Sequence, residues 1–324
     1  MTKKPRSRSI LRRLRSSPYL FILPALIGLL VLVLYPFAFN IFITFTNMNV
    51  YHIRACADLF ANAAQADQLH CYALNSSVQN NLFYNFGFVF TDPAFVQILE
   101  NSVIWTFSNV LPTVGLGLVL AFVLNSKVRG KTIYRLFMIV PWAMPSFITL
   151  LVWKGMYNYQ FGVINSLLGE IGVPAINWLN GSCFNAFVAI VIANIWLGYP
   201  FMMIIFSGAL QSIPQELYEA ASIDGAVGFT RMRTVTIPLI RPTIVIALLL
   251  GSIWTFNNFN SAYLITAGGP GICTTIFITQ AYNQAFSYFN FALAATYAFI
   301  AFIILFVPGF FWTRYTGLTR GGGS

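Results

Sequence analysis

The chain has 324 residues, of which 58% are hydrophobic and only 8% are charged, and its formal net charge is +10. A soluble globular domain has about 25% charged residues, so this composition excludes a soluble protein of ordinary surface. Long apolar blocks instead indicate an all-α integral membrane protein. The basic residues are confined to a few clusters at the chain start and between apolar blocks, which disfavours a nucleic-acid-binding protein.

Six apolar blocks along the chain are each close to the roughly 20 residues that a transmembrane helix needs. The first block follows a basic stretch, but its apolar run is too long for a signal peptide, so we expect a retained anchor. The predicted spans are residues 19–46, 98–125, 133–156, 184–210, 242–266 and 289–313.

The distribution of basic residues predicts the orientation of these spans. Most lysines and arginines lie before the first span and in the loops at 126–132 and 211–241. The positive-inside rule places these segments in the cytoplasm, together with both termini, and it places the 48–96 segment outside. The expected regions are a basic cytoplasmic tail at 1–17, a transmembrane domain at 18–316 and a C-terminal tail or linker at 317–324.

The four cysteines all lie on the outer side in this topology, which suits an oxidising compartment. We expect one disulfide between Cys56 and Cys71 and a second between Cys183 and Cys273. The alternative is that these cysteines are buried, unpaired thiols.

The predicted spans contain few ionisable residues, which disfavours a proton-coupled carrier or a charge-selective channel. They do contain uncharged polar side chains with aromatic neighbours. An amide in hydrocarbon needs a hydrogen-bond partner, either on another helix or on a ligand such as a neutral polyhydroxylated compound. Both alternatives stay open for the polar residues in these spans: Asn109, Asn194, Thr255, Asn257, Asn258, Asn260 and Ser261.

The sequence favours neither an enzyme nor a metal site. The stretch Gly130-Lys131-Thr132 resembles part of a phosphate-binding loop, but Asn125 stands at the position of its first glycine. A membrane enzyme should show catalytic groups near a membrane face, and a secondary carrier should show inverted repeats. Those two classes are therefore the less favoured alternatives to a transport subunit.

The predicted cytoplasmic loop at 211–241 contains a short helix. Ser212 and Gln215 predict a capping box at its start, and Asp224-Gly225 predicts its end.

A second helix is expected from about 227 to 236, ended by Pro238 and Pro242 before the fifth span. The small residues Ala220 and Ala221 suit the first helix for close packing in a partner's groove, although a solvated connector is the alternative.

Within this loop, Glu219-Ala220-Ala221, Gly225 and Ile237-Pro238 resemble the EAA loop of binding-protein-dependent ABC importer permeases. The resemblance extends from about residue 85 to 316, and it implies the type I ABC importer permease fold. The further stretches that resemble MalF-type permeases are Pro141-Trp142-Ala143-Met144-Pro145-Ser146-Phe147, Trp196-Leu197-Gly198-Tyr199-Pro200, Phe256-Asn257-Asn258-Phe259 and Gly268-Gly269-Pro270.

The resemblance implies half of the translocation pathway of an ATP-driven importer in a bacterial or archaeal cytoplasmic membrane. Maltose-like oligosaccharides are the implied substrates, with another sugar or a glycerophosphodiester as alternatives. The implied partners are a second, MalG-like permease, two MalK-like ATPase subunits and an extracytoplasmic solute-binding protein. ATP and Mg would bind the ATPases, and this chain would hold no cofactor.

The resemblance also assigns residues to two sites. The family has Tyr at positions 142 and 201 and Phe-Asn at 254–255, so an oligosaccharide site is implied that need not take maltose. The implied coupling residues, which would sit in a cleft of the ATPase, are Glu219, Ala220, Ala221, Asp224 and Gly225. The implied sugar-binding residues are Trp142, Ser146, Leu197, Gly198, Phe201, Trp254, Thr255 and Asn258.

Overall fold

The structure, a computed structural model, describes residues 19–49, 83–126 and 129–315. These residues are mostly helical, and their only bridge between extended segments is an isolated one, between Asn49 and Asn290. Five helices are long and apolar enough to cross a membrane, and a sixth span results if one bent pair counts as a single crossing. The expected all-α membrane fold is therefore confirmed.

Four of the predicted spans agree with the structure to within a few residues. The first consists of α2 (Tyr19–Leu29), the π-helical turn η1 (Leu30–Leu34) and α3 (Tyr35–Thr44). The second, fourth and sixth are the single helices α7 (Ala94–Asn125), α11 (Cys183–Gln211) and α17 (Phe291–Tyr315). The short helix α6 (Tyr84–Thr91) precedes α7.

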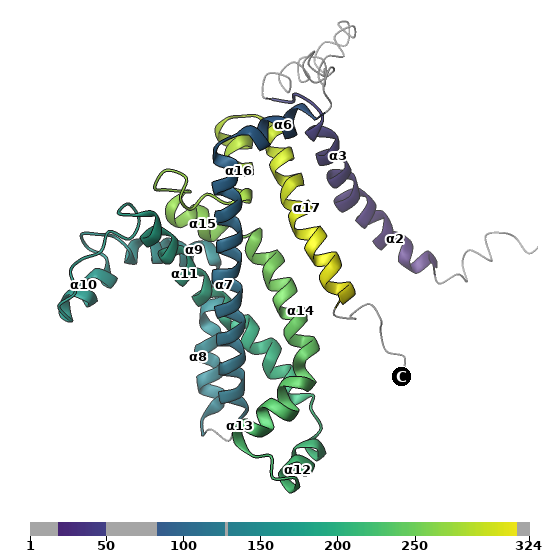
Figure 1. The fold of residues 1–324 in the computed structure, drawn as a ribbon, viewed down its shortest axis with the longest axis vertical. Helices are drawn as coiled ribbons and strands as arrows, with labels where there is room; N and C mark the ends of the chain where they lie inside the picture. Colours follow the sequence, from purple (N-terminus) through teal and green to yellow (C-terminus); the bar gives the residue numbers. More distant parts are fainter. Residues whose placement is uncertain (1–18, 50–82, 127–128, 316–324) are drawn as a thin grey trace, which may run out of the picture.

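The core of the molecule lies where α7 and α11 pack along each other beside α14 (Ile237–Phe256) (Figure 1). At Gly117 of α7, an added Cβ atom would lie 2.5 Å from the Cβ of Met202 on α11. Only glycine allows the two helices to approach so closely, as is common between membrane helices. The apolar side chains buried at this crossing are Val110, Val114, Ala121, Met202, Phe206, Leu210, Ile240 and Ala247.

The third predicted span, 133–156, is wrong as a single helix. It consists of α8 (Lys131–Ala143) and α9 (Ser146–Met156), whose axes meet at 91°. Met144 at the bend has extended backbone angles, φ −81° and ψ 145°. A residue before proline is pushed out of the helical region, so Pro145 accounts for the break.

The fifth predicted span was placed too far along the chain. One continuous helical stretch runs from Gly228 to Phe256, through α13 (Gly228–Arg231), the π-helical turn η4 (Met232–Thr236) and α14. Pro238 and Pro242 do not end it, contrary to expectation. Pro238 occupies the first turn of α14 directly after η4, where a missing N–H donor is tolerated. Residues 259–266 form a separate helix, α15 (Phe259–Thr266).

The short helix in the predicted cytoplasmic loop is α12 (Gln215–Ile223), and it lies at one end of the molecule (Figure 1). The predicted capping box is wrong, because the Ser212 hydroxyl donates to the carbonyl of Ala209, in the helix before, at 2.8 Å. The predicted end at Asp224-Gly225 is correct. Gly225 has φ +79°, a left-handed conformation that favours glycine.

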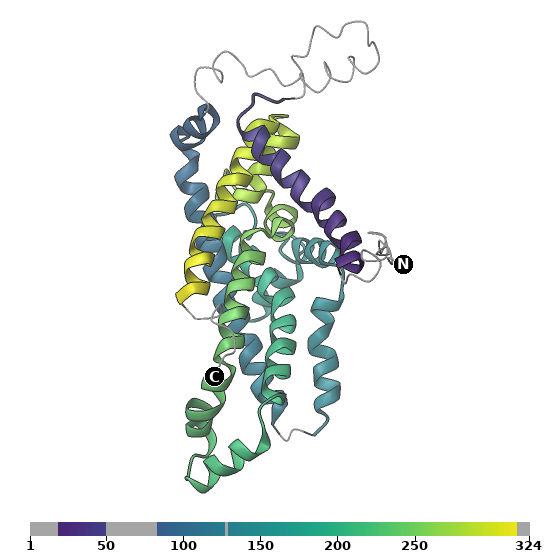
Figure 2. The ribbon, with the colours of Figure 1, turned by 90° about the vertical axis from the view of Figure 1, so that its right-hand side faces the viewer.

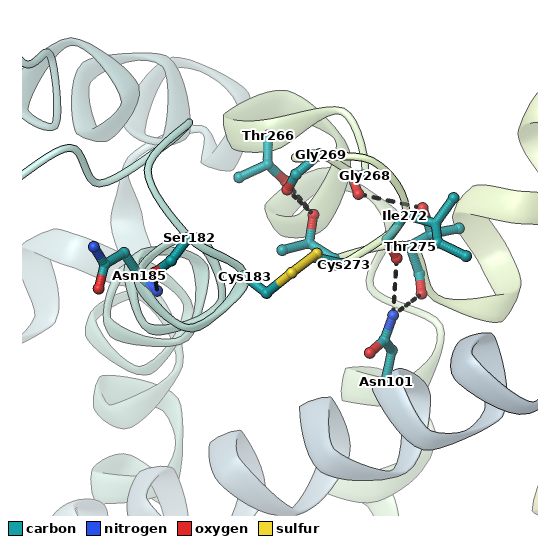
Figure 3. Close-up of a disulfide and its surroundings, with 11 residues drawn as sticks. Asn101, Ser182, Cys183, Asn185, Thr266, Gly268, Gly269, Ile272, Cys273 and Thr275 are labelled. Carbon is teal, nitrogen blue, oxygen red and sulfur yellow. Dashed lines mark hydrogen bonds between the residues drawn. A yellow bond between two sulfur atoms is a disulfide. The ribbon is translucent and has the colours of Figure 1, made fainter.

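The loop that joins α15 to α16 (Phe277–Tyr282) is tied to two neighbouring helices (Figure 3). Cys183 at the start of α11 forms the expected disulfide with Cys273 in this loop. The Asn101 amide on α7 donates to the carbonyls of Ile272 and Thr275 at 2.9 and 3.1 Å. The α16 helix continues into the π-helical turn η5 (Asn283–Ser287). The other predicted disulfide, Cys56–Cys71, lies outside the described residues.

Two elements extend away from the bundle. The first span slants away from the other helices and packs against α17, where the Phe37 and Phe302 rings are 5.1 Å apart (Figure 2). The short helix α10 (Val163–Glu170), between α9 and α11, projects sideways from the bundle (Figure 1).

Candidate functional site

A cavity of about 370 Å³ lies where the α8–α9 bend, α11 and the α14–α15 break come together. All eight residues predicted to bind sugar line it: Trp142, Ser146, Leu197, Gly198, Phe201, Trp254, Thr255 and Asn258. Six further residues that were not assigned to the site also line it: Thr113, Asn194, Met202, Gly251, Asn260 and Ser261. Both breaks in the predicted spans therefore contribute directly to the cavity wall.

Three aromatic rings form one wall of the cavity. The Trp142 and Phe201 rings are stacked, with centroids 5.7 Å apart and planes inclined by 29°. The Phe201 and Trp254 rings follow at 5.3 Å with a steeper inclination of 54°. The two indoles are each about half exposed, 51% for Trp142 and 54% for Trp254. The wall thus presents open aromatic faces, which suit stacking on an apolar ligand surface.

A chain of hydrogen-bonded amides supports the opposite part of the cavity. The Asn258 amide donates to Asn194 Oδ1 at 2.8 Å, and the Ser261 hydroxyl donates to the same oxygen at 2.9 Å. The Asn194 amide in turn donates to Asn109 Oδ1 at 2.9 Å. Asn109 is fully buried behind the cavity, and its own amide donates to the Trp105 carbonyl at 2.7 Å.

The amide chain leaves hydrogen-bonding capacity for a ligand. A side-chain amide has two N–H donors, and Asn194 and Asn258 each use one of them in the bonds described above. The Oδ1 atom of Asn258 accepts from the Ser261 backbone N–H at 3.2 Å, which caps the start of α15. The two alternatives for the polar cluster therefore combine, because the same amides join helices and line the cavity.

The cavity lining is uncharged. None of its fourteen residues carries an ionisable side chain. Within the described part of the chain, His, Cys, Asp and Glu also form no group of three that could hold a metal ion. A neutral ligand suits such a lining better than an ion, which would lose its hydration without gaining a counter-charge.

The residues predicted for ATPase coupling lie far from this cavity, on and beside α12. Glu219, Ala220 and Asp224 are exposed, whereas Ala221 is buried. The Arg231 guanidinium of α13 lies 5.3 Å above the centre of the Tyr218 ring, which ties α12 to the following helix.

Exposed apolar side chains surround the end of α12. Ile223 is 87% exposed, and Val227 and Phe229 are also exposed. The continuous helix from Gly228 to Phe256 joins this end of the molecule to the cavity, where Trp254 and Thr255 lie near its last residues.

Comparison with known proteins agrees with these features. Residues 113–315 match the family described as binding-protein-dependent transport system inner membrane components. The chain is 38% identical over 204 residues to the trehalose/maltose transport system permease protein MalF of Thermococcus litoralis, covering 63% of this chain and 68% of the relative. It is 31% identical over 290 residues to the galactooligosaccharides transport system permease protein GanP of Bacillus subtilis, covering 86% of this chain and 65% of the relative.

The fold is also similar to that of a solved structure. A chain of a bacterial ABC transporter involved in the import of the acidic polysaccharide alginate superposes with a TM-score of 0.76 at 18% sequence identity. The superposition covers 94% of this chain and 97% of the other. At this identity the likeness establishes the fold.

Proposed function

Because the chain belongs to the family of binding-protein-dependent transport system inner membrane components, we propose that it is the permease subunit of an ATP-driven importer for neutral sugars. Two relatives named for trehalose/maltose and for galactooligosaccharide transport support a sugar or oligosaccharide as the substrate. The chain is a transport component of the membrane and not an enzyme.

The observation that carries the sugar proposal is the pairing of an aromatic wall with free amide donors in one uncharged cavity. Trp142, Phe201 and Trp254 offer faces on which the CH surface of a pyranose ring stacks. Asn194 and Asn258 offer N–H donors to hydroxyl or ring oxygens. This combination orients a neutral polyhydroxylated ligand in a mainly apolar pocket.

The same lining disfavours a glycerophosphodiester. A phosphodiester is bound most strongly by arginine or lysine, or by several backbone N–H groups at a helix start. The cavity lining contains no cationic side chain. We therefore favour a neutral sugar over an anionic solute.

A second, MalG-like permease would complete the pathway. The half-exposed indoles and the amides of the cavity cannot face hydrocarbon without leaving hydrogen-bonding groups unsatisfied. A facing subunit with its own polar lining would enclose a water-filled route between the two chains. An extracytoplasmic solute-binding protein, consistent with the family's description, would deliver the sugar.

Two MalK-like ATPases would power the transport. We assign α12 as the element that docks on an ATPase, because Ile223 and Phe229 form an exposed apolar end beside it. ATP and Mg would bind those partners and no cofactor would bind this chain. Closure of the ATPases would move α12 and switch the opening of the cavity between the two membrane faces.

Reconstitution into liposomes tests the proposal. The chain is co-purified with its partner permease and ATPase, and uptake of radiolabelled neutral sugars and oligosaccharides is measured with the solute-binding protein present. We expect uptake of at least one neutral sugar that requires both ATP and the binding protein. Sugar uptake by the chain without any ATPase, or ATP-driven uptake of charged solutes alone, contradicts it.

A further inference from the structure

The segment between α9 and α11 forms an arm, residues 157–182, that contains α10 and projects from the bundle (Figure 1). It lies at the end of α11 away from α12, because α11 has 29 residues and a helix of that length extends about 43 Å. The eight residues of α10 are too few to cross a membrane, which needs about 20. The arm therefore joins two membrane-embedded helices without entering the membrane as a span.

The arm has a defined internal structure. All hydrogen-bond partners of the Asn165 side chain in the structure lie within the arm. Its amide donates to the carbonyls of Tyr159 and Ile176 at 3.2 and 3.0 Å. Its Oδ1 atom accepts from the Ile176 backbone N–H at 3.2 Å and from the Trp178 indole N–H at 3.0 Å. The direction in which each face of α10 points is thus set by buried polar contacts.

The base of the arm is fixed to the bundle. Tyr157 is buried, and its hydroxyl donates to the Ala189 carbonyl of α11 at 3.0 Å. Its ring also contacts that of Trp178, with centroids 5.5 Å apart. The arm is therefore held against α11 at its base while α10 extends away.

The residues of α10 fall into three sectors, as successive side chains turn by about 100° around a helix. The sector toward the rest of the arm holds Ile164, Asn165 and Leu168, which are buried or partly buried. On one flank, the polar sector holds the exposed residues Ser166, Gly169 and Glu170. On the other flank, the apolar sector holds the exposed residues Val163, Leu167 and Ile171.

The apolar sector has no cover within the described residues. Leu167 is 56% exposed and Ile171, which caps the helix, is 74% exposed. Phe161, just before the helix, is 75% exposed. The chain contains no lysine or arginine between Lys154 and Arg231, so an attraction to anionic groups does not contribute here.

We propose that the arm lies on the membrane surface at the side away from α12, with its apolar sector inserted among lipid acyl chains and its polar sector in water. A helix that buries one flank against protein, one in lipid and one in water has the side-chain pattern of an interfacial helix. Both neighbours of the arm are embedded in the membrane, which places α10 at the depth where lipid and water meet. Contact with a second permease or with a solute-binding protein is the competing explanation for the exposed side chains.

Fluorescence quenching in nanodiscs separates these occupants. Leu167→Cys and the neighbouring polar-sector variant Ser166→Cys are each labelled with bimane in the complex purified with its partner subunits. Cys56 and Cys71 are replaced by serine, and the Cys183–Cys273 disulfide does not react with the maleimide. Quenching is measured with phosphatidylcholine carrying a nitroxide on its acyl chain, and separately with iodide in the buffer.

We expect the nitroxide lipid to quench the label at position 167 several-fold more strongly than the label at 166, and iodide to show the reverse order. The contrast should persist in discs without anionic lipid. Equal quenching of both labels by iodide would place the arm in water and overturn the proposal. Shielding of the 167 label from both quenchers would overturn it too, since a protein partner would then cover the sector. Phe161→Cys repeats the test if Leu167→Cys does not assemble.

Discussion

The side chains of Asn194 and Asn109 are hydrogen-bonded to each other across the packed pair α11 and α7, with 2.9 Å between the amide nitrogen and the accepting oxygen. Both residues are buried, and they connect the cavity lining to the centre of the molecule. Because Asn194 also accepts from two groups on the α14–α15 side, one residue holds three helical segments in register. A buried polar network of this kind specifies one arrangement of the helices.

Replacing Asn194 should therefore destabilise the protein. In Asn194→Ala, the Asn109 oxygen, the Asn258 amide and the Ser261 hydroxyl each lose a partner, and we expect a loss of roughly 1–2 kcal/mol. Thermal unfolding of the purified complex in detergent measures it. The matched control is Asn257→Ala, because the exposed Asn257 amide bonds only to the Ile253 carbonyl of its own helix. Equal unfolding temperatures for the two variants would show that the network contributes little.

Removing the Trp254 ring should weaken sugar recognition without disturbing assembly. The ring is half exposed and lies beside Phe201 in the cavity, so Trp254→Ala removes an open stacking surface. We expect the KM for sugar uptake to rise about tenfold, which corresponds to about 1.4 kcal/mol. Ile253→Ala is the control, since that side chain does not line the cavity. An unchanged KM in Trp254→Ala would remove this ring from the site.

A side chain at Gly225 should impair coupling. The residue has φ +79°, and an alanine in the left-handed region costs about 1–2 kcal/mol. Gly225→Ala should lower the amount of sugar transported per ATP hydrolysed, or lower the amount of ATPase that co-purifies. Gly208→Ala in α11 is the control, because an added Cβ meets nothing within 4 Å there and the backbone is helical. Similar coupling ratios in both variants would argue against a shape-dependent docking role for this turn.

The contact of Arg231 with Tyr218 should hold α12 in place. A cation–π contact at an exposed site contributes about 0.5–1 kcal/mol, so Arg231→Gln should speed hydrogen exchange of the α12 backbone by about 2–5-fold. Arg233→Gln makes the same charge change two residues later, at an exposed position. If both variants exchange alike, net charge and not the ring contact governs the stability of α12.

The membrane helices were predictable because their signals are local. Long apolar runs between basic clusters locate most of the spans to within a few residues. The bend between α8 and α9 also had a local signal, since Met144 precedes a proline, and the prediction overlooked it. The cap of α12 failed for the opposite reason. Ser212 has the residue type of an N-cap, but it bonds back to α11 instead.

The cavity was predictable only in part. Eight of its residues came from resemblance to a family, and the structure brings them together around one space. Thr113, Met202 and Gly251 carry no chemical signal in the sequence, because their place in the lining follows from how α7, α11 and α14 pack. The role of Asn194 depended on a partner 64 residues away, Asn258, and no local pattern records such a pairing.

The uninterrupted helix from Gly228 to Phe256 acts as a lever between the two ends of the protein. Its 29 residues extend about 43 Å, so a tilt of about 10° at the α12 end would displace the Trp254 end by roughly 7 Å. The Trp254 ring is 5.3 Å from that of Phe201, and a displacement of that size would separate the two. A small rotation of the docking loop is thus enough to dismantle the aromatic wall and release a bound ligand, without any helix having to unfold.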